Sequence, residues 1–426
     1  MRVSREWFKD FVGPVWHTID LAKDKKFIEV RPQVLGKYGR SIRQVRNILT
    51  FKDIKTLQHP QVDSVVSMSV FNFTNPFERT LVFDLIRRSN ATLTELDFRG
   101  QAPPPNPREL QYQNGNYLEA GILSTCLTSC TGSPAIGSLL TSLSLTRICF
   151  SHEGFTTLLR NSPVLRHLAL FQVAILHFNE AFEQYRNSSI THLHAALDEI
   201  CMPDPGPGWA PSLLYQFSQL QEWHLTAVDR SKNWGNDAAF RRELRDCCPR
   251  LKTLRFDPVL ETDKLSDLLF NSFRQPESCT FSAKNLSQGM VLSLICHLKT
   301  LTTVILTDKC TDRATLRWLY LIPKSCSHLE VLSMQEVVLD MDSVDDHEWS
   351  CKYLRELRVR FEGLEDARDI IECLKNVYIQ RRRPNTHLPA VESISSRVSR
   401  HLLQFDRLAI VSLGSNTYNL RLADAE

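Results

Sequence analysis

The chain has 426 residues, of which 42% are hydrophobic and 23% are charged, and its net charge is +3. This balance is typical of a folded protein and excludes a wholly disordered chain. The small charge gives no ground for a nucleic-acid partner. No run approaches the ~18 apolar residues of a membrane-spanning helix, so we expect no membrane contact. The first residues lack the apolar core of a secretory signal.

An aromatic-rich segment opens the chain and differs in pattern from the remaining residues. Over residues 1–22, its large apolar and proline side chains are Val3, Trp7, Phe8, Phe11, Pro14 and Trp16. One interpretation is a hydrophobic cap that closes the first unit of the fold behind it. The other is a motif that binds a partner protein. Residues 23–60 are expected to form a junction and a first degenerate repeat.

An apolar pattern, L-x-x-L-x-L with any apolar residue at each L, recurs along the rest of the chain. Clear copies begin at residues 93, 140, 165, 190, 220, 251, 301, 329, 354 and 408, with a degenerate copy at 276 and weak early copies at 42 and 65. The copies at 140, 165 and 190, and again those at 251, 276 and 301, are 25 residues apart. Apolar residues at alternate positions predict a short strand in each copy.

Segments with helical periodicity lie between these predicted strands. Residues 311–326 place Leu316, Leu319 and Tyr320 on one helix face. Residues 364–379 place Ile370, Ile371, Leu374 and Val377 on one face. A strand and a helix every 25 residues predict an α/β leucine-rich-repeat solenoid, or horseshoe, over residues 61–426. Single repeats cannot bury their apolar faces alone, so the stacked repeats are expected to share one core.

Cysteine recurs three residues before the apolar pattern, at Cys248, Cys326 and Cys351. Ser162 and Asn90 occupy the same place elsewhere, and we interpret the thiols as packing groups at the corner between helix and strand. The run CPRLKTLRF resembles the cysteine-containing class of leucine-rich repeats. The twelve cysteines include no CxxC pair, which favours reduced thiols and a cytoplasmic or nuclear location.

The opening segment resembles the C-terminal part of an F-box, which ends in a helix bearing V-S/C-x-x-W and then P-x-x-W. An F-box followed by such repeats resembles the F-box/LRR family. That resemblance implies a partial, helical F-box in residues 1–22, whose valine, aromatic and proline side chains bind a Skp-type adaptor within a cullin–RING ubiquitin ligase. The repeats would hold the target protein. The first F-box helix is missing from this sequence, so an interaction scaffold without a ligase link is the alternative.

Residues on either side of the middle apolar position are expected on the concave, partner-binding surface of the solenoid. These candidates are Glu95, Asp97, Arg99, His167, His192, His194, Glu222, His224, Arg255, Glu356, Arg358 and Arg360. Adjacent strands lie about 4.8 Å apart, so His167 is expected beside His192, and His194 beside His224. The histidines suggest either a metal site or ordinary surface polarity, and we favour the second. The mixed charge suits a protein partner.

No complete catalytic motif occurs in the sequence. The phosphate-binding loop, the dinucleotide-binding glycine pattern, H-E-x-x-H and G-x-S-x-G are all absent. We therefore expect no enzyme activity, no cofactor, no metal and no small-molecule substrate. The basic run Arg381–Arg383 suggests a targeting or nucleic-acid patch or, as we favour, cations at the end of a helix.

Overall fold

The computed structural model describes residues 14–71, 76–100, 139–176, 185–196, 202–203, 209–210, 214–225, 246–256, 275–282, 288–297, 299–309, 313–383, 393–414 and 416–420. They belong to two compact units, Met1–Leu220 and Gln221–Glu426. Both units repeat the same strand-and-helix plan. No helix in the described part of the chain is long and apolar enough to cross a membrane.

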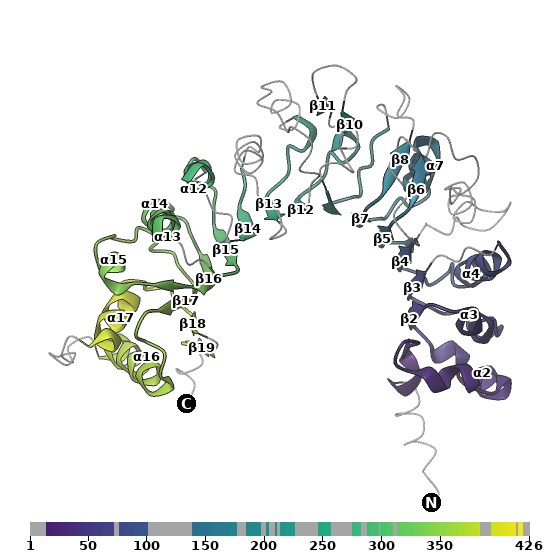
Figure 1. Cartoon of the computed structure of the whole chain (residues 1–426), viewed down its shortest axis with the longest axis horizontal. Helices are drawn as coiled ribbons and strands as arrows, with labels where there is room; N and C mark the ends of the chain where they lie inside the picture. Colours follow the sequence, from purple (N-terminus) through teal and green to yellow (C-terminus); the bar gives the residue numbers. More distant parts are fainter. Residues whose placement is uncertain are drawn as a thin grey trace, which may run out of the picture. The chain divides into compact units, whose positions relative to one another are not determined.

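The first unit is built on a parallel sheet whose strands succeed one another in chain order (Figure 1). Its register keeps equivalent residues of each repeat side by side, as in the row Leu96, Leu143, Leu168 and Leu193. The strands are β1 (Thr18–Asp20), β2 (Gln44–Ile48), β3 (Ser67–Phe71), β4 (Glu95–Arg99), β5 (Ser142–Thr146), β7 (His167–Phe171) and β9 (His192–Ala195).

Helices α2 to α4 of this unit lie together on one side of the sheet (Figure 1). The α-helices are α2 (Pro32–Tyr38), α3 (Phe51–Leu57), α4 (Pro76–Arg88) and α7 (His152–Arg160). Short 3-10 helices are η1 (Lys25–Glu29), η2 (Gly39–Ser41) and η4 (Leu214–Gln216). Two small sheets pair β6 (Cys149–Ser151) with β8 (Ala174–Leu176), and β10 (Met202–Pro203) with β11 (Trp209–Ala210).

The second unit continues the plan with seven parallel strands and a final antiparallel one. The strands are β12 (Glu222–Leu225), β13 (Thr253–Phe256), β14 (Ser278–Ser282), β15 (Thr303–Thr307), β16 (Val331–Leu339), β17 (Glu356–Phe361), β18 (Ile410–Leu413) and β19 (Asn416–Asn419). The helices are α12 (Gln288–Ile295), α13 (Arg313–Leu319), α14 (Leu321–Ser325), α15 (Met341–Asp345), α16 (Ala367–Arg382) and α17 (Ile394–Leu403).

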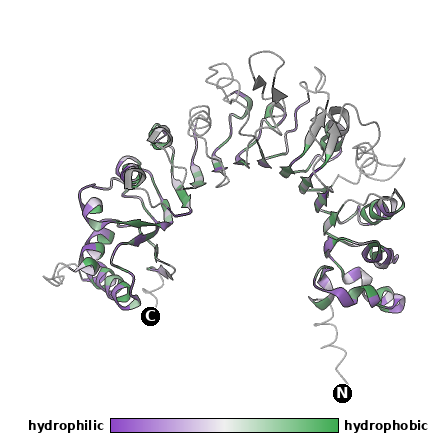
Figure 2. Ribbon diagram, viewed as in Figure 1, coloured by the Kyte–Doolittle hydropathy of each residue, from purple (hydrophilic) through white to green (hydrophobic). Residues whose placement is uncertain are grey.

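Alternation along each strand creates the core of both units. In β7, Leu168 and Leu170 are buried, whereas His167 and Ala169 are at least partly exposed. Apolar and polar residues both occur along α16 and α17 (Figure 2). Burying one face of each strand beneath the helices removes the apolar pattern of every repeat from water.

A tight turn precedes β16 and β17, and the recurring cysteine lies at the start of this turn. The carbonyl of Cys326 accepts a hydrogen bond from the N–H of Leu329 at 3.2 Å, and Cys351 does the same for Leu354 at 3.1 Å. Burial raises the pKa of both thiols to about 12, so they are protonated at neutral pH. A protonated thiol is a poor nucleophile, and both cysteines are fully buried, which supports their packing role.

Gly100 shows how closely neighbouring repeats approach after a strand ends. Its N–H donates to the carbonyl of Thr146 at 2.6 Å. A side-chain carbon at this position would lie 1.9 Å from the carbonyl oxygen of Arg147. No side chain fits at that distance, so only glycine allows this contact between β4 and the turn after β5.

The apolar pattern is confirmed as a strand predictor, with two differences of detail. All the copies from 42 to 408, including the weak ones at 42, 65 and 276, coincide with strands of the main sheets. The sheet, however, begins at β1, inside residues 1–22, where we expected a partial F-box and no strand, although Trp16, Ile19 and Leu21 fit the pattern. On α16, Ile370, Leu374 and Val377 are buried as predicted, but Ile371 is 44% exposed. Ile371 is one residue, or about 100°, away from Ile370, and Cys373 completes the buried face instead.

Candidate functional site

The strand face, meaning the side chains of the parallel strands that point away from the helices, carries the polar candidates in both units. In the sheet register, Ser67, Glu95, Ser142, His167 and His192 form one row of the first unit. Their buried neighbours on the other face hold each strand in place. The core therefore fixes the position of the strand face. The outward side chains can differ from repeat to repeat without disturbing that core.

One cluster on the first unit combines charge with an aromatic ring. The Arg99 guanidinium lies 2.7 Å from the Asp97 carboxylate, which also accepts a hydrogen bond from Ser69 at 3.1 Å. The same guanidinium lies 5.5 Å from the centre of the Phe71 ring. Arg99 is therefore fixed in direction but remains 43% exposed at its side chain. An oriented, partly exposed arginine above a ring is a common element of protein interfaces.

The histidines of β7 and β9 form a second cluster. His167 and His192 stack with their ring centres 4.3 Å apart, as the 25-residue spacing predicts. His194 meets the edge of Phe171 at 4.4 Å, and the Thr191 hydroxyl lies 2.8 Å from Nδ1 of His192. His194 belongs to the first unit and His224 to the second, so their expected contact stays a prediction.

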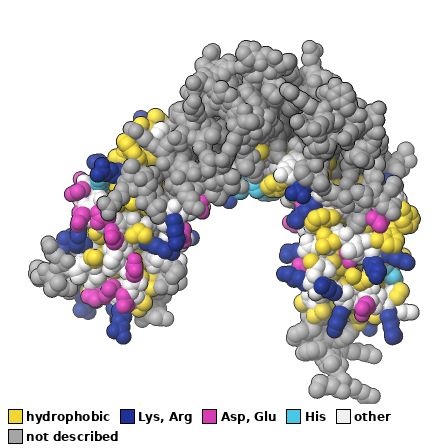
Figure 3. Space-filling view, in the orientation of Figure 1, with side chains coloured by type: hydrophobic (Ala, Val, Ile, Leu, Met, Phe, Trp, Pro, Cys, Tyr) yellow, Lys and Arg dark blue, Asp and Glu magenta, His cyan; other side chains and the backbone are white. Residues whose placement is uncertain are grey.

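On the second unit, the predicted charges form ion pairs on or beside the strands. Arg255 lies 3.1 Å from Glu222, across the β12–β13 pair. Arg358 forms a hydrogen bond with Glu356 on its own strand. His224 lies beside Arg255 in the register. Figure 3 shows basic, acidic and apolar side chains interspersed on the coloured parts of the surface rather than a field of one sign.

The described residues contain no group of three histidine, cysteine or acidic side chains arranged to hold a metal ion. Stacking holds His167 and His192 ring to ring, which is not the arrangement of two ligands converging on one ion. Within the described residues, the strand face carries oriented ion pairs, stacked imidazole rings and partly exposed aromatic side chains.

The N-terminal candidates divide between described and undescribed residues. Val3, Trp7, Phe8 and Phe11 lie outside the described residues. Residues 14–17 are helical, Pro14 is exposed, and Trp16 is half-buried. The Trp16 ring stacks on Tyr38 at 5.5 Å and meets the edge of Phe27 at 6.1 Å. Trp16 therefore packs against the start of the first unit, as the capping interpretation expects.

The sequence patterns missed several surface residues. Phe71 and Phe171 come directly after the last buried residue of their strands and face outward beside the arginine and histidine clusters. Extending the alternation by one more position would have identified both.

The basic run ends α16, and Arg381 donates to the carbonyls of Phe405 at 2.7 Å and Leu408 at 2.8 Å. The place of Arg381 and Arg382 in the last turn of α16 is what the helix-end interpretation expects, while the contact of Arg381 joins α16 to the turn before β18.

Comparisons with known proteins found similarity among solved structures only. No protein-family model matches the chain, and no curated protein matches it. The leucine-rich repeat-containing protein LegL7 from Legionella pneumophila is similar over 68% of this chain and 91% of its own, with 13% identity and a TM-score of 0.39. A chain of the TLR13–ssRNA13 complex is similar over 78% of this chain and 50% of its own, with 14% identity and a TM-score of 0.33. At these levels of similarity the architecture rests on the chain's own register and core, which are those of an α/β leucine-rich-repeat solenoid.

Proposed function

We propose that this chain is a non-catalytic recognition protein that binds a protein partner through the strand face. The strongest support is the alternation of side chains along each strand. The inward side chains are apolar and build the core, while many of the outward side chains carry charge, imidazole or aromatic groups. Oriented ion pairs and partly exposed rings give a partner both direction and apolar area. The proposal assigns the chain no cofactor, no nucleic-acid partner and a cytoplasmic or nuclear location.

Site-specific photo-crosslinking tests this proposal. A photoreactive phenylalanine analogue at Ala169, between the histidine cluster and β5, should capture a partner in cells. The matched control carries the analogue at the exposed Lys324 of α14. The captured protein, purified and titrated, should bind the Arg99→Glu variant at least tenfold more weakly than the native chain. Equal capture from both positions, or unchanged binding by Arg99→Glu, would refute the strand-face assignment.

We also propose the finer role of target receptor in a cullin–RING ubiquitin ligase. Its support is the residue pattern of the opening segment, Val3, Trp7, Phe8, Phe11, Pro14 and Trp16, ahead of a repeat array. Large apolar anchors of this kind dominate the energy of helical interfaces. A scaffold without a ligase link remains the alternative, and the packing of Trp16 on Tyr38 supports it.

Co-purification with a Skp-type adaptor and its cullin distinguishes the two. The native chain, a Trp7→Ala variant and a chain extended by a complete first F-box helix should recover adaptor in the order extended, native, variant. Thermal melting of the native chain and of the Trp7→Ala variant serves as the folding control. If the extended chain recovers no adaptor, the ligase role is wrong and the scaffold stands.

A further inference from the structure

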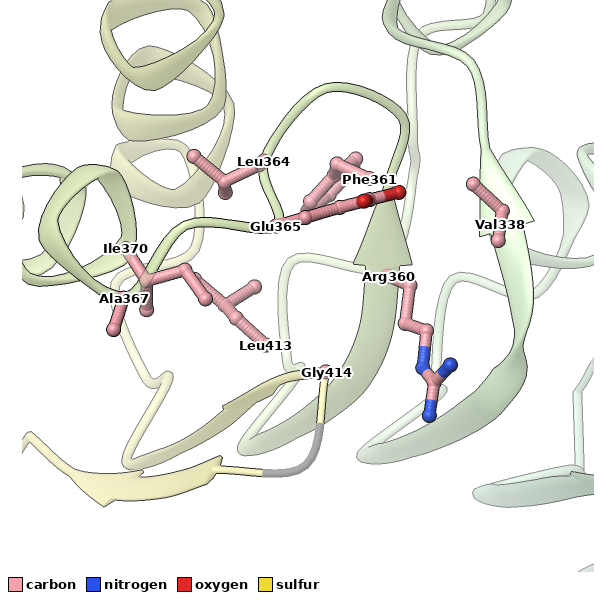
Figure 4. A pocket seen from close by; sticks show the side chains of 9 residues that line it. All are labelled: Val338, Arg360, Phe361, Leu364, Glu365, Ala367, Ile370, Leu413 and Gly414. Atoms are coloured by element: carbon pink, nitrogen blue, oxygen red, sulfur yellow. The ribbon is translucent and has the colours of Figure 1, made fainter.

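A pocket of about 370 Å³ opens beside the ends of β17 and β18 in the second unit, over the apolar side chains of Phe361 and Leu413 (Figure 4). Its two charged lining residues have opposite signs. Arg360 is already paired with Glu336 at 3.6 Å, and Glu365 repels an anion. The pocket therefore favours neither an acidic nor a basic ligand. A surface of the first unit is more selective, because it combines exposed rings with lysines that have no partner among the described residues.

Two phenylalanine rings lie exposed at the starts of the neighbouring helices α3 and α4 (Figure 1). Phe51 and Phe77 have ring centres 6.1 Å apart and planes tilted by 47°. Phe77 is 61% exposed and Phe51 is 37% exposed, and Leu49, just before α3, is 43% exposed. Because a phenylalanine can bury roughly 150–250 Å², the two rings leave on the order of 200 Å² of aromatic surface in water. Adjoining apolar side chains in water mark an interaction site, whereas single ones need no explanation.

The core does not need either ring. Helix α4 already buries Phe83 and Leu85, and Phe83 stacks on Phe98 of β4 with ring centres 6.4 Å apart. Phe51 and Phe77 also lie outside the strand face, because each belongs to a helix rather than to a strand. None of the sequence patterns predicted this pair, since the apolar pattern follows strand positions alone. The rings therefore belong to a second candidate surface.

Two lysines lie beside these rings. Lys55 comes four residues after Phe51, so their side chains share one face of α3. Lys52 and Lys55 are both exposed, and neither ammonium group has an ion pair or hydrogen bond among the described residues. Asp53 between them is 3% exposed, and its carboxylate accepts hydrogen bonds from two backbone N–H groups at the start of α3. That carboxylate is therefore not available to either lysine.

The acidic residues of α4 leave a surplus of positive charge here. Asp84 is paired with Arg87 at 3.2 Å. Glu78 follows Phe77 directly, but successive residues lie about 100° apart around a helix, and Glu78 is only partly exposed. Two exposed lysines on the α3 side of the rings thus stand against one partly exposed carboxylate on the α4 side. An incoming carboxylate is attracted to the α3 side.

We propose that this aromatic–lysine patch, formed by Phe51, Phe77, Lys52 and Lys55, binds an acidic segment of a partner protein. A bulky apolar residue of that segment covers the two rings, while its carboxylates pair with the lysines. A second copy of this chain fits less well, because a two-fold contact brings the same lysines of both copies together. An anionic membrane fits less well, because Glu78 lies next to the more exposed ring and repels lipid phosphates. The patch adds a binding surface that is separate from the strand face.

Saturation-transfer NMR on the full chain tests this contact with the peptide acetyl-Glu-Glu-Leu-Trp-Glu-Glu-amide as the probe. Acetyl-Gln-Gln-Leu-Trp-Gln-Gln-amide removes its charges, and acetyl-Glu-Glu-Ser-Ser-Glu-Glu-amide removes its apolar anchor. Phe77→Ser removes the more exposed ring, with Leu292→Ser, at a 46% exposed position of α12, as its control. Lys55→Glu reverses one charge, with Lys324→Glu, at an exposed position of α14, as its control. Thermal melting verifies that all four variants are folded.

We expect the acidic peptide to bind the native chain with a dissociation constant of about 1 mM, which burial of ~200 Å² of apolar surface can support. Phe77→Ser and Lys55→Glu should each weaken binding about tenfold, while both control variants bind like the native chain. Failure of the native chain to bind, equal binding of either comparison peptide, or unchanged binding by Phe77→Ser or Lys55→Glu would overturn the inference.

Two further measurements address the other occupants. Sedimentation equilibrium should show no dimer that Phe77→Ser dissociates. Flotation with vesicles of phosphatidylcholine and phosphatidylserine in equal parts should show no binding that the same variant abolishes. A dimer would assign the patch to a second copy, and vesicle binding would assign it to a lipid surface, so either result would overturn the acidic partner. Because these variants lie outside the strand face, their results are independent of the strand-face crosslinking.

Discussion

Replacing Leu168 by alanine tests whether neighbouring repeats share one core. Leu168 is 1% exposed and lies between Leu143 and Leu193 in the sheet register. The change deletes three carbon groups, each worth about 0.8 kcal/mol of burial. The cavity left behind adds to this loss, so the free energy of unfolding should fall by ~2–5 kcal/mol.

Urea denaturation measures the loss, and hydrogen exchange locates it. Exchange should quicken first in β5 and β9, because repeat stability is built from contacts between neighbours. Val164→Ala, at a position 42% exposed just before the same strand, is the control and should cost ~0.5 kcal/mol or less. A loss below about 1 kcal/mol for Leu168→Ala, or unchanged exchange in both flanking strands, would contradict a shared core.

Three further expectations concern single side chains. Arg381→Met should lower the free energy of unfolding by about 2 kcal/mol in a urea titration, because two carbonyls before β18 lose a charged donor; an unchanged midpoint would contradict this. Burial lowers the pKa of His401 from 6.5 to about 4, so the unfolded chain binds the proton more readily. The free energy of unfolding is therefore highest above a pH of about 6.5 and falls by about 3 kcal/mol as the pH drops toward about 4; His401→Gln should flatten that slope in pH-dependent melting. Finally, protein purified without added metal should contain no stoichiometric zinc by elemental analysis, and zinc that disappears on replacing His192 and His194 by alanine would refute the assignment of these rings to recognition.

The apolar spacing predicted the strands because each buried position recurs in phase with the sheet. It also predicted that His167 meets His192, since a 25-residue shift moves a side chain to the same place on the next strand. The same spacing fits β1 at Trp16, Ile19 and Leu21, but we overlooked this copy because the aromatic residues of that segment suggested another role. Nor could it predict that a terminal nitrogen of Arg360 lies 3.6 Å from Glu336, because Glu336 lies where the register between β16 and β17 shifts.

Arg88 links two repeats in a way that constrains how this chain can change in length. From α4, its guanidinium donates to the backbone carbonyls of Leu57, Gln58 and His59, where α3 ends in the preceding repeat. Removing the repeat of α4 would leave those carbonyls without their donor, even if the remaining strands closed up in register. A deletion in this region should therefore be tolerated best when both repeats are removed together.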